Sequence, residues 1–369
     1  MIRIDELYNN TFWPYIAKNI PQTRLFFCDP PGSSSPENLL NYGQDSLELN
    51  YIFLHDQEPI HLDIHKELFI EVQFRNRDIE HWGPCKAIII TSEYQSETVD
   101  YVSNYLDWES HYYFFHGWAA MDWYRGYHRS FLISEPESRT ITKTFIAPNR
   151  IVAGKRQHRV LMLYHIFKNN LLNNWISCPA VCPEENIAVL DVCNSLEHIY
   201  PDITEVFSQQ TLPMNFPDET GSPMHSCWLS LFDESSECLL YLITETVASG
   251  NRLHLTEKSF KPICMRMPFI IVGTRGSLAY LRMYGFKTFG DIWDESYDDE
   301  PDDILRIEKI GKLLNQLDSL SQMEKQELFN RAIPIIEHNY NHFYGGRFEA
   351  ILWDELKNML EAIRVSLHI

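Results

Sequence analysis

The sequence predicts an α/β protein with two domains. Its 369 residues exceed the length of one typical domain, which is about 100–200 residues. Short apolar runs recur in the first part of the chain and are separated by longer segments, as is typical of strands buried on both faces of a parallel sheet. After residue 140 the strand and helix patterns alternate again, which indicates a second sheet of the same kind.

The composition narrows the class of protein. Hydrophobic residues make up 44% of the chain and charged residues 22%, as in a globular protein. The formal charge of −20 disfavours nucleic acid or anionic lipid as a partner over most of the surface, so nucleic-acid binding would need a local basic patch. The eight cysteines form no CxxC pair and no set at zinc-binding spacing, so we expect free thiols, mostly in the core.

The sequence also indicates where in the cell the protein is expected. The N-terminus lacks the apolar stretch of a signal peptide, and no run approaches the roughly 18 apolar residues of a membrane span. Free thiols are kept in reducing compartments. We therefore expect a cytoplasmic protein without a membrane span.

The first domain, residues 1–140, is expected to hold four strands. Each is an apolar run that ends in polar or charged residues: 24–29, 51–55, 87–91 and 112–116. Segments 32–36 and 81–84 are rich in Gly, Ser and Pro or contain a Gly-Pro pair, and we expect loops there.

The second domain, residues 141–325, begins at a shift in composition. From Thr140 to Pro183 there is no Asp or Glu, in a chain that has 51 of them. This part predicts a strand over 144–147, a turn over 148–154 and a helix over 159–168, with its basic residues near the helix start, where the backbone also favours anions. The later elements follow in order: an apolar run at 187–190, a helix before Ser208, a loop at 211–226, strands at 239–243 and 269–272, and a helix at 276–284 ended by Gly285.

The remainder of the chain is expected to be helical. Residues 291–303 hold eight acids in thirteen positions, which is typical of a solvated loop or a helix start. Apolar residues at helical spacing predict a helix over 304–320. C-terminal helices in residues 326–369, broken near Pro334 and at Gly345-Gly346, are expected to pack back across the domains.

The first candidate site consists of two acidic loops and the lysines beside them. Glu245 follows one strand, and Thr256, Glu257, Lys258 and Lys261 lie in the loop before the next. A carboxylate can accept hydrogen bonds from two sugar hydroxyls and a lysine can neutralise a phosphate, as recognition of a nucleotide sugar requires. The alternative is a surface Glu-Lys pair of little energetic value.

The second candidate is the basic turn that holds Arg150, Lys155, Arg156 and Arg159. Arginine grips phosphate oxygens bidentately, and clustered arginines at a helix N-terminus repel one another and the helix dipole unless an anion is present. The alternative is a solvated helix start that pairs with the acidic segment 291–303.

The third candidate comes directly after the strand at 51–55. Asp56 and Glu58 are placed where a general base would lie, and Pro59 ends the strand. The alternative is a turn in which Asp56 caps backbone amides. Without further carboxylates nearby, the pair does not predict a metal site.

The fourth candidate is the aromatic stretch 112–127. We assign Phe114, Phe115 and Trp118 to the core and leave His116, Asp122 and Arg125 as candidates for a cleft. The chain has no GxGxxG, P-loop, HExxH or GxSxG motif, so oxidoreductase, NTPase, zincin and hydrolase activities lack their usual support.

Several of these motifs resemble those of glycosyltransferases. Residues 240–300 contain TEKSF at 256–260, PFIIVG at 268–273 and DESYD at 294–298, and they resemble the donor-binding half of α-1,3-fucosyltransferases, whose TEK-x-F motif they match. They are also similar to phage and bacterial glycosyltransferase-like proteins. Looser similarity extends to residues 149–150, 56–59, 115–117 and 122–125.

The resemblance implies a GT-B arrangement, in which two Rossmann-like domains face a cleft. The donor, a UDP- or GDP-sugar, would bind the second domain without a metal, Glu257 on its ribose or sugar and Lys258 on its diphosphate. Asp56 or Glu58 of the first domain would act as the base, with inversion at the sugar.

The acceptor implied by the resemblance is a glycan or, for a phage enzyme in the cytoplasm of a bacterial host, a hydroxymethylated DNA base. A non-catalytic module that binds a nucleotide sugar is the alternative from another class of function. The sequence carries no prediction of the oligomeric state.

Overall fold

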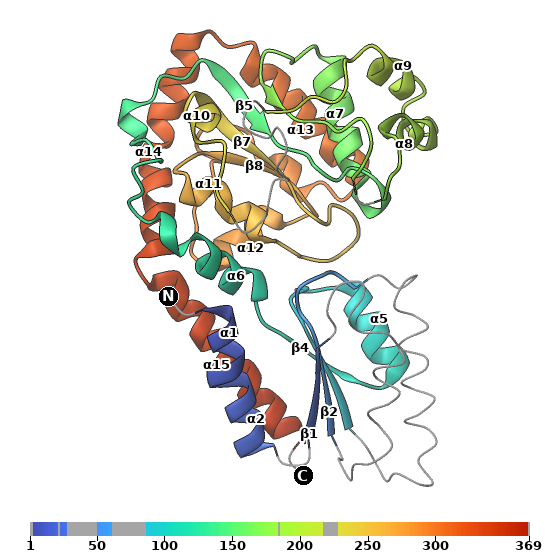
Figure 1. The fold of residues 1–369 in the computed structure, drawn as a ribbon, viewed down its shortest axis with the longest axis vertical. Coiled ribbons are helices and arrows are strands. Elements are labelled where there is room, and N and C mark those ends of the chain that lie inside the picture. The colour runs from blue at the N-terminus through green and yellow to red at the C-terminus, as the bar shows by residue number, and fades with distance from the viewer. Residues whose placement is uncertain are drawn as a thin grey trace. The chain divides into compact units, whose positions relative to one another are not determined.

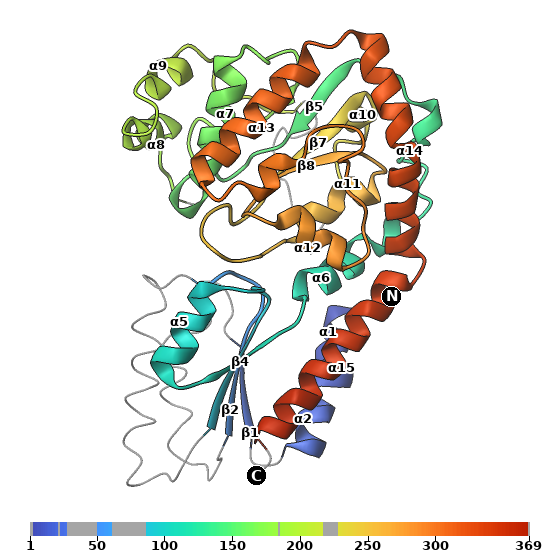
Figure 2. The same ribbon diagram turned by 180° about the vertical axis from the view of Figure 1, so that it is seen from behind.

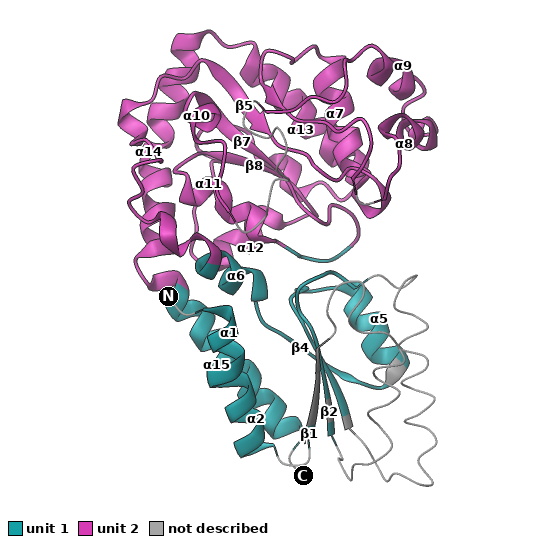
Figure 3. Ribbon diagram, viewed as in Figure 1, with its two compact units in different colours: residues 1–122, 251–254, 349–369 teal, residues 123–250, 255–348 magenta. Residues whose placement is uncertain are grey.

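The computed structural model describes residues 3–20, 23–27, 50–60, 86–183, 185–216 and 228–367. The chain forms two compact units, shown in separate colours in Figure 3. Unit 1 comprises residues 1–122, 251–254 and 349–369, and unit 2 comprises residues 123–250 and 255–348. Each unit contains a parallel sheet with helices, so the α/β class predicted from the sequence is confirmed.

The sheet of unit 1 has four parallel strands in the order β1-β2-β3-β4. They are β1 (Thr23–Phe27), β2 (Asn50–His55), β3 (Lys86–Thr91) and β4 (Glu109–Tyr112). In β2 and β3 the residues 52–54 and 88–90 are all buried. Their continuous apolar sequence reflects helices on both faces of the sheet.

Helices cover both faces of this sheet. Figures 1 and 2 show α1 (Ile4–Leu7), α2 (Trp13–Asn19) and α15 (Arg347–Leu367) on one side and α5 (Glu97–Leu106) on the other. A π-helical turn, η1 (Tyr8–Phe12), joins α1 to α2. The Tyr15 hydroxyl donates to Glu361 at 2.8 Å and ties α2 to α15.

The sheet of unit 2 also has four parallel strands, in the order β6-β5-β7-β8. They are β5 (Lys143–Ala147), β6 (Trp175–Ile176), β7 (Cys238–Thr244) and β8 (Phe269–Val272). Every residue of β7 and β8 is buried, so these two strands form the centre of the core.

The helices of unit 2 lie on both faces of its sheet. In Figures 1 and 2, α7 and α13 lie side by side over one face, and α10 and α14 lie over the other. The helical elements are α6 (Phe115–Tyr124, which begins in unit 1), η2 (Arg125–Tyr127), η3 (Pro136–Ser138), η4 (Gly154–Arg156), α7 (His158–Lys168), α8 (Val189–Leu196), α9 (Ile203–Ser208), α10 (Phe232–Ser236), η6 (Glu257–Phe260), α11 (Lys261–Cys264), α12 (Ser277–Met283), η7 (Ser296–Asp299), α13 (Asp303–Asp318) and α14 (Gln322–Tyr344).

Two predicted elements are wrong. The strand expected over 112–116 ends at Tyr112 as β4, and α6 begins at Phe115. Since α6 is buried around most of its circumference, its apolar run has no helical periodicity and cannot be told from a strand. The break expected near Pro334 is absent, because α14 continues through that residue to Tyr344. Buried side chains along α14 offset the lost backbone hydrogen bond.

Other predictions are confirmed. Phe114, Phe115 and Trp118 are buried, and α12 is followed by Gly285 at φ +87°, a left-handed conformation that favours glycine. Five cysteines among the described residues are free and buried. The loops predicted at 32–36 and 81–84, and most of the one at 211–226, lie outside the described residues. No helix in the described part of the chain has the length and apolar content to span a bilayer.

Candidate functional site

The candidate site lies at the carboxyl edge of the sheet in unit 2. The chain begins this sheet at β5, adds β6 on one side, and returns to add β7 and then β8 on the other. The connection after β5 therefore leads to one side of the sheet and the connection after β7 to the other, which makes the boundary between these two strands a topological switch point. Ligands of open α/β sheets bind at such a switch point.

Asn149 links the strand ends at this switch point. Its Nδ2 donates to the carbonyl oxygens of Ala147 at 3.2 Å and Ser177 at 3.4 Å. Its Oδ1 accepts a hydrogen bond from Thr244 Oγ1 at 3.0 Å. Asn149 thus joins the ends of β5, β6 and β7, and it fixes the start of the basic turn.

Arg159, for which the sequence predicts a phosphate contact, braces the two loops. Its guanidinium donates to the carbonyl oxygens of Ile151 at 2.8 Å, Thr244 at 3.0 Å and Glu245 at 3.2 Å. Burial, and then the neighbouring Arg156, lower its pKa to about 10, so it stays charged at neutral pH. The structure thus gives Arg159 a positioning role.

His158 lies beside Arg159 at the start of α7. Its Nε2 donates to the carbonyl oxygen of Glu245 at 2.9 Å. Burial, reinforced by the charge of Arg159, lowers its pKa to about 3. The imidazole is therefore neutral at physiological pH and acts as a fixed hydrogen-bond donor.

The carboxylate of Glu245 is used within the protein. It is fully buried and accepts hydrogen bonds from four donors, two of them hydroxyls. Thr256 Oγ1 and Ser259 Oγ each lie 2.6 Å from it, and the backbone amides of Thr246 and Thr256 each lie 3.2 Å from it. Glu245 therefore holds the loop that leads to η6, and no sugar hydroxyl is needed to satisfy it.

Glu257 and Lys258 form an ion pair in η6. Lys258 Nζ lies 2.9 Å from Glu257 Oε1, 3.2 Å from Thr256 Oγ1 and 3.3 Å from Thr246 Oγ1. The Glu257 side chain is 5% exposed and that of Lys258 is 29% exposed. An incoming anionic ligand would therefore meet the ammonium group first, with the carboxylate behind it.

The basic turn after β5 holds further cations. Arg150 and Arg156 are partly exposed and Lys155 is exposed, all in the basic turn after β5. Arg156 has no hydrogen bond or ion pair with any residue that the structure describes, and its charge lowers the pKa of both His158 and Arg159. The repulsion expected of clustered arginines is therefore present. Lys261 is buried at the start of α11.

The acidic segment 291–303 caps helices. Asp298 accepts hydrogen bonds from the backbone amides of Leu278 and Ala279 and so occupies the N-terminus of α12. Asp302 caps α13, as expected of a helix start. None of the ion pairs found among the described residues joins this segment to the basic turn.

In unit 1 the predicted residues lie at different places. Asp56 is buried after β2, and its Oδ2 accepts hydrogen bonds from the hydroxyls of Tyr8, at 2.5 Å, and Tyr113. Glu58, two residues on, is partly exposed. The ring of His116 is buried, and Asp122 accepts the backbone amide of Ile4 at 3.2 Å and so caps α1.

Sequence reasoning missed Arg306 of α13. It is buried and donates to the carbonyl oxygens of Ala248 at 2.8 Å, Gly273 at 2.9 Å and Glu300 at 2.9 Å. It therefore braces the loops after β7 and β8 as Arg159 braces those after β5 and β7. In the sequence, Arg306 lies four residues before Ile310 and so on the same, apolar face of the helix. An arginine at such a position could have indicated a buried residue that binds backbone carbonyl oxygens.

Glu93 of unit 1 was also missed. It is buried after β3, forms an ion pair with Arg252 at 3.4 Å, and accepts from Ser96 Oγ at 2.8 Å. Glu93 follows the predicted strand 87–91 just as Asp56 follows the strand at 51–55. The reasoning that identified Asp56 as a candidate could therefore have identified Glu93 as well.

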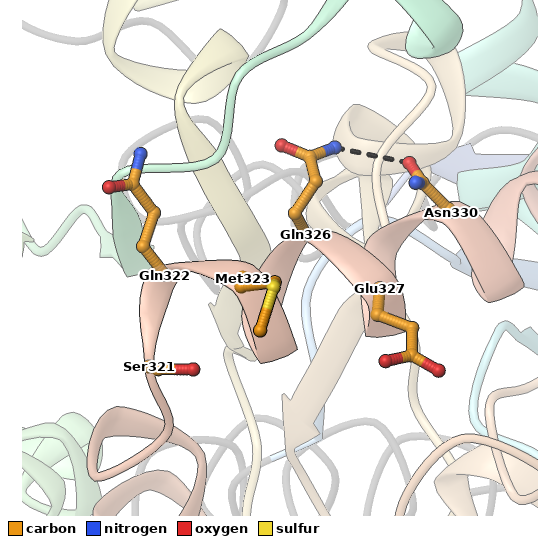
Figure 4. A pocket seen from close by; sticks show the side chains of 6 residues that line it. All are labelled: Ser321, Gln322, Met323, Gln326, Glu327 and Asn330. Atoms are coloured by element: carbon orange, nitrogen blue, oxygen red, sulfur yellow. Dashed lines mark hydrogen bonds between the residues drawn. The ribbon is translucent and has the colours of Figure 1, made fainter.

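A shallow hollow on α14 is a poor rival site (Figure 4). It is lined by one face of the helix, and its Gln326 already has partners: Gln326 Nε2 donates to Asn330 Oδ1 at 3.1 Å, and Gln326 Oε1 accepts from the amide of Ile141 at 2.9 Å. No cation lies among its lining residues. In the described part of the chain, no group of three or more His, Cys, Asp or Glu residues is arranged to bind a metal ion.

Comparison with known proteins gives no family. No family model matches the chain, and neither curated proteins nor solved structures give a match. Function is therefore inferred from the geometry of the switch point.

Proposed function

We propose that the protein is a glycosyltransferase of GT-B arrangement, which moves a sugar from a nucleotide diphosphate sugar to an acceptor hydroxyl with inversion. One observation carries the proposal: the Glu257-Lys258 pair lies in the loop that Glu245 ties to the end of β7, at the switch point of the sheet in unit 2.

The cations suit a diphosphate. Lys258 presents an ammonium group, and Arg156 adds a guanidinium that no other described residue neutralises. Together with Arg150 they would bind the phosphates and stabilise the negative charge that develops on the leaving group, the role a metal ion has in other enzymes. Glu257 would accept hydrogen bonds from ribose or sugar hydroxyls once Lys258 pairs with the phosphates of the ligand.

Two buried residues would act indirectly. Glu245 holds Thr256 and Ser259, and Arg159 holds the loops after β5 and β7. We propose that both preorganise the loops and that neither touches the donor. A positioned loop pays no reorganisation cost when the ligand binds.

The reaction needs a base in unit 1. As the acceptor oxygen forms its bond to the anomeric carbon, the bond from that carbon to the phosphate oxygen breaks, and the hydroxyl proton passes to a carboxylate. Glu58 is the better candidate because this residue is partly exposed, whereas Asp56 is buried and already accepts from two tyrosine hydroxyls. His116 and Asp122 would have supporting roles at most.

Release of nucleoside diphosphate from UDP- and GDP-sugars tests the proposal. We expect turnover with one of the donors in the presence of a glycan or hydroxymethylated-DNA acceptor. In Glu257→Ala the turnover should fall about tenfold to a hundredfold, since a hydrogen bond to a charged group contributes about 1.5–3 kcal/mol. Lys287→Gln, an exposed lysine elsewhere in unit 2, is the matched control.

The outcomes separate the alternatives. Full activity in Glu257→Ala would contradict the site. Thermal stabilisation by a nucleotide sugar without turnover on any acceptor would instead indicate a non-catalytic binding module.

A further inference from the structure

The loop that follows α6 in unit 2 exposes apolar side chains. Phe131 is 94% exposed and the adjacent Leu132 is 46% exposed. Two consecutive large apolar residues at the tip of one loop form a surface that water solvates poorly. We name residues 125–133 the aromatic-basic loop; in Figure 1 it follows α6 on the way to β5.

The exposure does not come from an unstructured chain. Two successive turns are closed by hydrogen bonds from Ser130 N to Tyr127 O at 3.0 Å and from Ile133 N to Ser130 O at 3.1 Å. The amide of Arg129 donates to the Tyr340 hydroxyl of α14 at 2.9 Å. The loop is therefore held in shape with Phe131 in solvent.

The backbone of Arg129 is strained. Its φ of +58° is left-handed, a conformation that a non-glycine residue adopts at a cost. The ring of the preceding His128 stacks on Tyr344, with centroids 4.8 Å apart and planes 18° from parallel. Contacts with α14 thus maintain a conformation that the sequence alone disfavours, which is typical of a functional segment.

The charge of the loop is opposite to that of the whole protein. From residue 123 to residue 134 there is no acid, while Arg125 and Arg129 are both exposed. Burial, then the charges of Arg129 and Arg266, lower the pKa of His128, so it is neutral at pH 7. The first acid that follows, Glu135, forms an ion pair with Arg266.

We propose that the aromatic-basic loop docks on an anionic lipid bilayer. The ring of Phe131 and the aliphatic side chain of Leu132 would enter the interface between headgroups and acyl chains, and the arginines would contact lipid phosphates. Leu132 favours this partner over single-stranded nucleic acid, because an aliphatic side chain has no ring on which a base could stack. The proposal is independent of the proposed function, since none of these residues belongs to the switch-point site.

Sedimentation with lipid vesicles tests the docking. We expect the protein to bind vesicles of phosphatidylcholine and phosphatidylglycerol in equal parts, to bind phosphatidylcholine alone much less, and to be released by salt. Phe131→Ala should weaken binding by at least about tenfold, as loss of one buried aromatic side chain does. Arg129→Gln should weaken it about fivefold.

Two control variants remove the same kinds of side chain, one apolar and one cationic, at other exposed positions of unit 2. Met323→Ala removes another apolar side chain of unit 2, one that is 79% exposed without arginines beside it in the sequence (Figure 4), and Lys287→Gln removes an exposed cation elsewhere. Both should bind like the wild type.

Three results would overturn the proposal: no binding to anionic vesicles, wild-type binding by Phe131→Ala, or equal losses in the controls. Concentration-dependent dimerisation that Phe131→Ala abolishes, without vesicle binding, would instead assign the loop to contact with a second copy.

Discussion

His158 should make the stability of the protein fall as the pH is lowered. In the folded protein its pKa is about 3, whereas in the unfolded chain it is near 6.5. Below pH 6.5 the unfolded state therefore binds a proton that the folded state does not, and unfolding is favoured. Between pH 7.5 and 5.0 this single group should remove about 2 kcal/mol from the free energy of unfolding, at about 1.4 kcal/mol per pH unit below 6.5.

Urea unfolding at the two pH values measures this effect. Because other groups also titrate, the informative quantity is the difference between wild type and His158→Gln, which retains a donor for the carbonyl oxygen of Glu245 but does not ionise. The variant should lose about 2 kcal/mol less than the wild type between pH 7.5 and 5.0. Parallel losses in the two proteins would refute the neutral, buried state of His158.

Three further substitutions are tested by urea unfolding, two at the braces of the carboxyl edge and one at the turn after α12. Glu245→Ala, which leaves four donors without their acceptor, should cost about 3 kcal/mol; a loss under about 1 kcal/mol would contradict its anchoring role. Arg306→Met should cost about 2 kcal/mol, since three carbonyl oxygens lose a charged donor; unchanged stability would exclude it as a brace. Gly285→Ala should cost about 1–2 kcal/mol, because φ is +87° and the new Cβ would lie 2.8 Å from the His342 ring; a neutral effect would mean that the turn can rearrange.

Strands were the most predictable part of the fold. The apolar runs at 51–55, 87–91, 239–243 and 269–272 all lie in strands. Hydrophobicity marks such segments because both faces of the sheets are covered. It fails at Phe115, where a helix buried on most sides has the same composition as a strand.

The roles of the polar residues were less predictable. Glu245 and Glu257 follow similar sequence patterns, yet four internal donors satisfy the first and a partly exposed lysine pairs with the second. Arg159 is buried and reaches backbone carbonyl oxygens, whereas Arg156, three residues earlier, is partly exposed. Sequence identifies the residue type and the edge of the sheet, but satisfaction of a polar group depends on partners distant in the chain.

The strand order was also outside the reach of the sequence. Motifs located the loops after β5 and β7 separately, but only the order β6-β5-β7-β8 makes them neighbours across a switch point. The candidate site depends on that order, because β5 precedes the basic turn, β7 precedes the loop with the Glu257-Lys258 pair, and the two strands are neighbours in the sheet.

The most direct test of this account is the affinity for a nucleotide diphosphate sugar, measured by calorimetric titration. We expect the wild type and Lys287→Gln to bind, and the affinity of Lys258→Ala to be lower by at least about tenfold, since a charged hydrogen bond to phosphate is removed. Equal affinity in Lys258→Ala and the wild type would contradict a donor site at the switch point of unit 2.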